Sequence, residues 1–99
     1  MSRTRESLPE LTADSKGIWW VTTASGTVHI WDMDKGTVLR APNAVRPLRF
    51  DGEWLPITLV TRYPRVGAQS VAAFPHPADP ERAVVRTSAT VLRIERAAY

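Results

Sequence analysis

The chain has 99 residues, of which 43% are hydrophobic and 23% charged, and it contains no cysteine. At this length we expect a single core, which excludes a multidomain enzyme and argues against a large buried pocket. Thirteen basic and ten acidic side chains give a net charge of +3, and the lack of cysteine excludes disulfides, thiolate nucleophiles and cysteine metal sites.

Residues 1–16 are predicted to form a polar N-terminal tail or a short helical turn, because Ser7 and Glu10 have the spacing of a capping box. The positive charge near Met1 is not followed by the apolar run of roughly 7–15 residues that a secretory signal requires. We therefore expect a cytoplasmic protein. No segment approaches the roughly 18 apolar residues of a membrane span, so no membrane partner is predicted.

From residue 17 to residue 99 the chain follows a period-two pattern, which predicts one β-domain. Aromatic and β-branched runs indicate the first three strands, at 18–23, 27–31 and 37–40. Glycine in each of the two short connections can supply the positive φ of a tight turn. These runs are therefore expected to form a three-stranded meander.

A loop with two prolines at residues 42–47 leads into the second half. Asp51 and Gly52 then predict a tight hairpin between 48–50 and 53–55, because Asp-Gly suits a two-residue type I′ turn. Pro56 predicts a bend or a sheet edge, because proline lacks a ladder donor. Further strands are expected at 57–63, 69–74 and twice within 83–95, with an exposed proline-rich loop at 75–80.

Short strands at this spacing predict an all-β fold with minimal helix, either a small barrel or a sandwich of about seven short antiparallel strands. Several stretches also carry a resemblance: Gly17-Ile18-Trp19, Ser25-Gly26-Thr27, Asp32 to Asp34, Leu48-Arg49 before Asp51-Gly52-Glu53, and Arg86-Thr87 before Val91. In this order they resemble short all-β proteins of actinobacteria and their phages. The resemblance implies a bacterial or phage cytosolic setting, and it carries no catalytic or binding residue across.

Groups that could perform catalysis are sparse. The two histidines, His29 and His76, lie far apart in the sequence and do not have the spacing of metal ligands. Ser25 lacks the sequence context of a nucleophile elbow, and the paired acids flank turns, where acids commonly bond to the local backbone. We therefore expect a non-enzymatic domain with no cofactor and no metal.

The tryptophans indicate an interaction surface. Trp19 and Trp20 are neighbours, so their side chains point to opposite faces of a strand. His29 and Trp31 share one face of the next strand, and the β-branched residues on its other face are the better core candidates. We expect Trp19, His29 and Trp31 on an outer sheet face that binds a protein partner or a second copy of the chain, although a structural cross-strand contact is the alternative.

Single-stranded nucleic-acid binding is the alternative function. Residues 41–99 hold eight arginines and five acids, so the net charge is concentrated there. Small barrels bind single strands by combining a basic groove with aromatic faces. The candidate surface consists of Arg46, Arg49, Trp54, Arg62, Tyr63 and Arg65.

Overall fold

The computed structural model describes residues 6–41, 52–76 and 78–97, which form nine strands and no helix. One group of strands comprises β1 (Ser7–Leu8), β2 (Ile18–Thr23), β3 (Val28–Asp32), β4 (Thr37–Arg40), β5 (Trp54–Pro56) and β9 (Val91–Arg96). The other comprises β6 (Leu59–Arg62), β7 (Val71–His76) and β8 (Asp79–Thr87).

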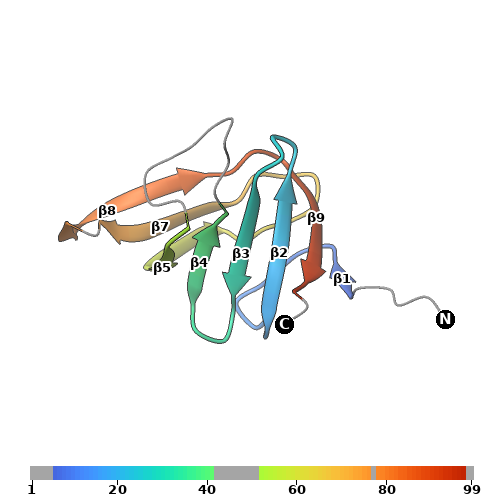
Figure 1. Cartoon of the computed structure of the whole chain (residues 1–99), viewed down its shortest axis with the longest axis horizontal. Helices are drawn as coiled ribbons and strands as arrows, with labels where there is room; N and C mark the ends of the chain where they lie inside the picture. The colour runs from blue at the N-terminus through green and yellow to red at the C-terminus, as the bar shows by residue number, and fades with distance from the viewer. Residues whose placement is uncertain (1–5, 42–51, 77, 98–99) are drawn as a thin grey trace.

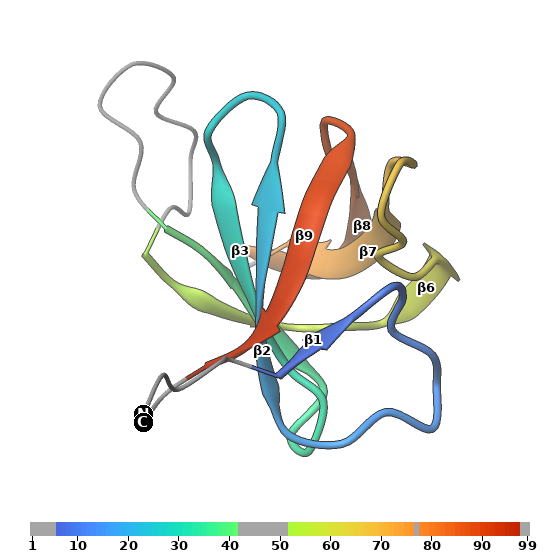
Figure 2. The same ribbon diagram turned by 90° about the vertical axis from the view of Figure 1, so that its right-hand side faces the viewer.

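The strands form two antiparallel sheets that face each other (Figure 1). The larger sheet has the order β1-β9-β2-β3-β4-β5 (Figure 1), and the smaller has the order β6-β7-β8 (Figure 2). The all-β prediction is confirmed, but the described residues form two open sheets with nine strands rather than a closed barrel with about seven. No helix in these residues is long and apolar enough to cross a membrane.

The predicted meander is present as β2-β3-β4. Its register sets Trp19 opposite Trp31 and Trp31 opposite Val38. The two connecting turns contain Gly26 and Gly36, with φ of 84° and 67° respectively. Glycine adopts this left-handed backbone without the steric cost that a Cβ atom imposes, which is why both turns can be short.

The chain passes from the larger sheet to the smaller one after Pro56. This proline ends β5, an edge strand, so the predicted bend or edge at Pro56 is confirmed. β5 pairs with β4, where Leu55 lies opposite Val38. The strand expected at 48–50, the other half of the predicted Asp-Gly hairpin, lies outside the described residues.

The expectation of an exposed loop at residues 75–80 is wrong for most of that segment. β7 continues through Pro75 to His76, and β8 begins at Asp79. The pairing of β7 with β6 ends at Ala73, so Pro75 lies where β7 pairs only with β8. Proline is tolerated where a strand pairs on one side only, because its nitrogen can face the unpaired side, where no N–H donor is required.

Part of residues 6–16 joins the sheets, so the segment predicted as a polar tail or a short helical turn contains a short strand instead of a helical turn. β1 pairs with β9, and Glu6 accepts a 2.6 Å hydrogen bond from Arg96 Nε in an ion pair. The Leu11 N–H donates to the Pro64 carbonyl at 2.9 Å, and the Leu11 side chain is only 1% exposed. β1, the Leu11 contacts and the Glu6–Arg96 pair thus hold this polar segment on the sheets at several points.

The core lies between the two sheets and is built around two tryptophans. Trp19 and Trp31 are each 2% exposed. The Trp19 Nε1–H donates to the Lys16 carbonyl at 2.8 Å, which satisfies the polar atom of the buried indole. Trp31 packs against Tyr63 with ring centroids 6.3 Å apart. The other buried apolar residues are Leu11, Val21, Val38, Ala72, Phe74, Val91 and Ile94.

We predict that Leu11→Ala lowers the free energy of unfolding by about 2–5 kcal/mol, because the lost carbons leave a cavity under residues 6–16. Leu92→Ala is the matched control, since Leu92 is 55% exposed, and it should change stability by no more than about 0.5 kcal/mol. Urea denaturation followed by tryptophan fluorescence measures both values. If Leu11→Ala lowered the free energy of unfolding as little as Leu92→Ala, the anchoring of residues 6–16 by Leu11 would be contradicted.

Candidate functional site

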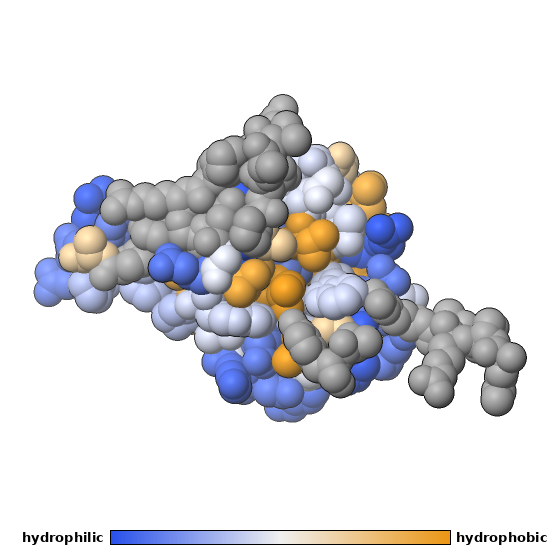
Figure 3. Space-filling view, in the orientation of Figure 1, coloured by the Kyte–Doolittle hydropathy of each residue, from blue (hydrophilic) through white to orange (hydrophobic). Residues whose placement is uncertain are grey.

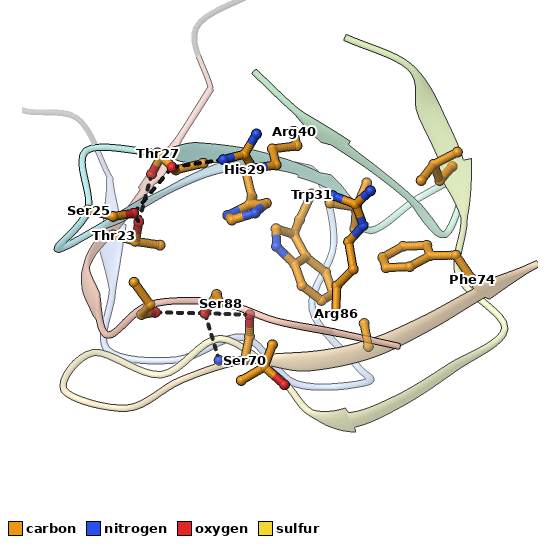
Figure 4. Close-up of a pocket in the computed structure, with 15 residues that line it drawn as sticks. Thr23, Ser25, Thr27, His29, Trp31, Arg40, Ser70, Phe74, Arg86 and Ser88 are labelled. Carbon is orange, nitrogen blue, oxygen red and sulfur yellow. Dashed lines mark hydrogen bonds between the residues drawn. The ribbon is translucent and has the colours of Figure 1, made fainter. Parts of the chain in front are cut away.

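A pocket of about 370 Å³ lies between the two sheets. Its volume falls within the range of roughly 300–1,000 Å³ that is typical of small-molecule sites. One wall comes from β2 to β5, and the other from β7, β8 and the turn after β8 (Figure 4). This pocket opens to solvent, so it is not the large buried pocket that the length of the chain argues against. Many facing side chains are serine, threonine or alanine, which leave this space unfilled.

The apolar end of the pocket consists of Trp31, Val38, Leu55 and Phe74. Strand register assembles three of them, because Trp31 is opposite Val38 and Val38 is opposite Leu55. Phe74 reaches the same end from β7 of the smaller sheet (Figure 4). Trp31, Val38 and Phe74 are 2%, 5% and 4% exposed, so this end of the pocket is formed by side chains of the packed core.

Next to the apolar end lie three basic residues, His29, Arg40 and Arg86, which we name the cationic belt after its two guanidinium groups. His29 lies opposite Arg40 in the pairing of β3 with β4. Arg86 comes from β8, and Figure 4 shows its side chain rising between Trp31 and Phe74. All three are half-buried, so a group bound here would be partly withdrawn from water.

Hydroxyl groups form the third part of the pocket, its hydroxyl end. On the larger sheet, Ser25 Oγ lies 3.0 Å from Thr23 Oγ1 and donates to Thr27 Oγ1 at 3.2 Å. On the smaller sheet, Ser88 Oγ accepts hydrogen bonds from the Ser70 N–H at 2.9 Å and from Ser70 Oγ at 3.0 Å. Ser25 is exposed, so the pocket meets solvent at this end.

The described residues that line the pocket include no carboxylate. Arg40 Nη2 donates to Thr27 Oγ1 at 3.4 Å, which links the cationic belt to the hydroxyl end. Guanidinium groups bind carboxylate or phosphate through pairs of parallel hydrogen bonds, and hydroxyls can add further donors. The pocket is therefore equipped to hold an anionic group. Within the described ranges, no cluster of three or more histidines and acids could hold a metal ion.

The expected outer surface of Trp19, His29 and Trp31 is wrong, because all three lie on the inner face of the larger sheet. The two tryptophans are in the core, and His29 lines the pocket. The misassignment arises in β3, where both faces carry apolar side chains. The indole of Trp31 fills more interior volume than Val28 or Ile30 on the opposite face, and the fold uses it as the core residue.

The outer face of the larger sheet carries a different apolar row, which we name the outer row. Trp20 lies opposite Ile30, Ile30 opposite Leu39, and Leu39 opposite Trp54, so the row crosses four neighbouring strands. Trp54 is 44% exposed and the other three are half-buried. Figure 3 shows apolar atoms gathered at the centre of this face.

The residues predicted to bind nucleic acid are dispersed. Arg46 and Arg49 lie outside the described residues. Trp54 lies on β5, at one edge of the larger sheet. The backbone of Arg65 forms an isolated β-bridge with Glu10, near β1 at the opposite edge. The remaining two differ in environment, with an exposed Arg62 on β6 and Tyr63 packed against Trp31. This alternative stays a prediction.

Most of the pocket residues were not identified from the sequence, including Arg40, Phe74 and Arg86. Alternate positions of their strands do run from polar to apolar, as in Ser70, Ala72 and Phe74. This polar-to-apolar order can be seen in the sequence. It does not say which strands of the two sheets face each other, so it does not identify a pocket.

Comparison of the chain with protein-family models, curated proteins and solved structures gave no match. The functional argument therefore rests on the residues of this chain.

Proposed function

We propose that the protein is a non-enzymatic binding domain, that its site is the pocket between the sheets, and that its ligand carries an anionic group. The observation that carries this proposal is the composition of the described pocket lining. It combines the cationic belt with the hydroxyl end and contains no carboxylate. A carboxylate or a phosphate is the chemistry that such a lining complements.

Local contacts rather than long-range attraction account for this recognition. A net charge of +3 on 99 residues produces only a modest field around the molecule. A hydrogen bond to a charged group contributes about 1.5–3 kcal/mol, compared with about 1 kcal/mol for a neutral one. The arginines of the cationic belt are therefore expected to supply most of the affinity.

We predict that Arg86→Gln weakens binding of propanoate or inorganic phosphate about tenfold or more, because it removes a charge-assisted hydrogen bond. The measurement is a ¹H–¹⁵N NMR titration with each anion, with sodium chloride at matched ionic strength as the reference. In the wild type, saturable shifts should centre on the amides of Thr27, Arg40 and Arg86.

Arg93→Gln is the matched control for this titration. Arg93 has a 64% exposed side chain on β9, and it pairs with Glu95 rather than lining the pocket. Its loss should leave both affinities unchanged. Equal weakening by the two substitutions would mean that the anions respond to net charge alone, which would contradict the pocket as the site.

The outer row favours a second candidate function, contact between two copies of the chain. A face with an exposed tryptophan at one end of a continuous apolar row is typical of a protein interface. A twofold dimer joins the same surface of both copies and needs no other partner. Such an interface would use the outer row and leave the pocket accessible.

For this second candidate we predict that Trp54→Ser weakens self-association about tenfold or more, because tryptophans often dominate interface energies. Sedimentation velocity over a concentration series measures the effect. Leu59→Ser is the control, since Leu59 is 62% exposed but lies on β6 of the smaller sheet. A wild type that remains monomeric at every concentration would remove this candidate.

A further inference from the structure

The two walls of the pocket change from polar to apolar in the same direction. On β7 the residues that line the pocket run from Ser70, just before the strand, through Ala72 to Phe74. Ser70 hydrogen-bonds to Ser88, and Ala72 lies opposite Arg86. The smaller sheet therefore presents hydroxyls, then a cation, then an aromatic ring.

The larger sheet repeats this order on the facing wall. Thr27 lies just before β3, and His29 and Trp31 are the next alternate residues along the strand. All three line the pocket. Arg40 lies opposite His29, and Val38 lies opposite Trp31. In strand register both walls thus have hydroxyl, basic and apolar positions in matching order. Figure 4 shows the hydroxyls of Ser25 and Ser88 at one end and Phe74 at the other, with the Arg86 side chain reaching between Trp31 and Phe74.

The burial of the lining residues increases in the same direction, from the hydroxyl end to the apolar end. Trp31 and Phe74 at the apolar end are 2% and 4% exposed, whereas Ser25 and Thr87 near the other end are exposed. A ligand would therefore enter past the hydroxyl end with its apolar group leading, and its ring would displace the Arg86 side chain from between Trp31 and Phe74 (Figure 4). Alternate residues of a strand are about 7 Å apart. In a ligand that reaches both positions, the anionic group and the apolar group would therefore be separated by only a few bonds.

We infer that the ligand is a small arylalkyl carboxylate, whose ring packs against Trp31 and Phe74 at the apolar end and whose carboxylate pairs with the cationic belt. This inference rests on the proposed anion-binding function and adds the ligand class. The planar fork of arginine matches a carboxylate, and the aromatic side chains offer faces and edges for a ring.

The test uses the full-length protein and three probes in ¹H–¹⁵N NMR titrations: 3-phenylpropanoate, propanoate and 3-phenylpropanamide. The first should bind about tenfold or more tightly than propanoate, because its ring is removed from water. It should also bind about tenfold or more tightly than the amide, which has the same shape without the charge.

A pair of variants tests the location of the ring. Ala72→Leu extends a side chain into the pocket and should weaken 3-phenylpropanoate about tenfold while leaving propanoate within about threefold. Ala73→Leu makes the same change at the next residue of β7, which does not line the pocket, and should alter neither affinity. The three wild-type titrations decide the ligand class even if Ala72→Leu does not fold.

The outcomes separate the inference from the function on which it rests. Equal affinity for 3-phenylpropanoate and propanoate would overturn the arylalkyl class and leave anion binding in place. Binding of phosphate but of no carboxylate would do the same. Equal affinity for 3-phenylpropanoate and its amide would overturn the anionic requirement itself, and no binding by any probe or by phosphate would overturn both. Unchanged 3-phenylpropanoate binding in Ala72→Leu would overturn the placement of the ring.

Discussion

The pairing of β2 with β3, which sets Trp19 opposite Trp31, determines which face of the larger sheet is the interior. Side chains alternate along a strand, so a slip of one residue in this pairing would turn the inner set outward. Glu6 and Arg96, which are far apart in the sequence, also meet at Trp19, because the Arg96 guanidinium lies 4.8 Å from the centroid of its ring and is paired with Glu6. This contact adds to the backbone pairing of β9 with β2 and of β1 with β9.

The same register builds the pocket, since the inner face that buries the tryptophans also carries His29 and Arg40. The pocket is thus continuous with the core, and Trp31 belongs to both. A ligand that fills it would extend the apolar contacts of a small core and stabilise the folded state by mass action. Under the proposed function, binding and stability would be coupled through the contacts of Trp31 and Phe74.

The sequence was sufficient to predict the local structure where turn chemistry and period-two runs coincide, as in the meander around Gly26 and Gly36. It was insufficient where both faces of a strand are apolar, because Ile30 and Trp31 are each plausible core residues and only the facing sheet decides between them. β1 was missed because a strand of two residues has no periodicity. The pocket was missed because Arg40 and Arg86 lie on different sheets, and whether they line one pocket depends on how the sheets pack.

Intermolecular nuclear Overhauser effects between 3-phenylpropanoate and the protein test the central claim most directly. The account predicts contacts from the ring protons of the ligand to the side chains of Trp31, Val38 and Phe74. Contacts to Trp20 and Trp54 of the outer row, without any to Trp31 or Phe74, would contradict a binding site between the sheets.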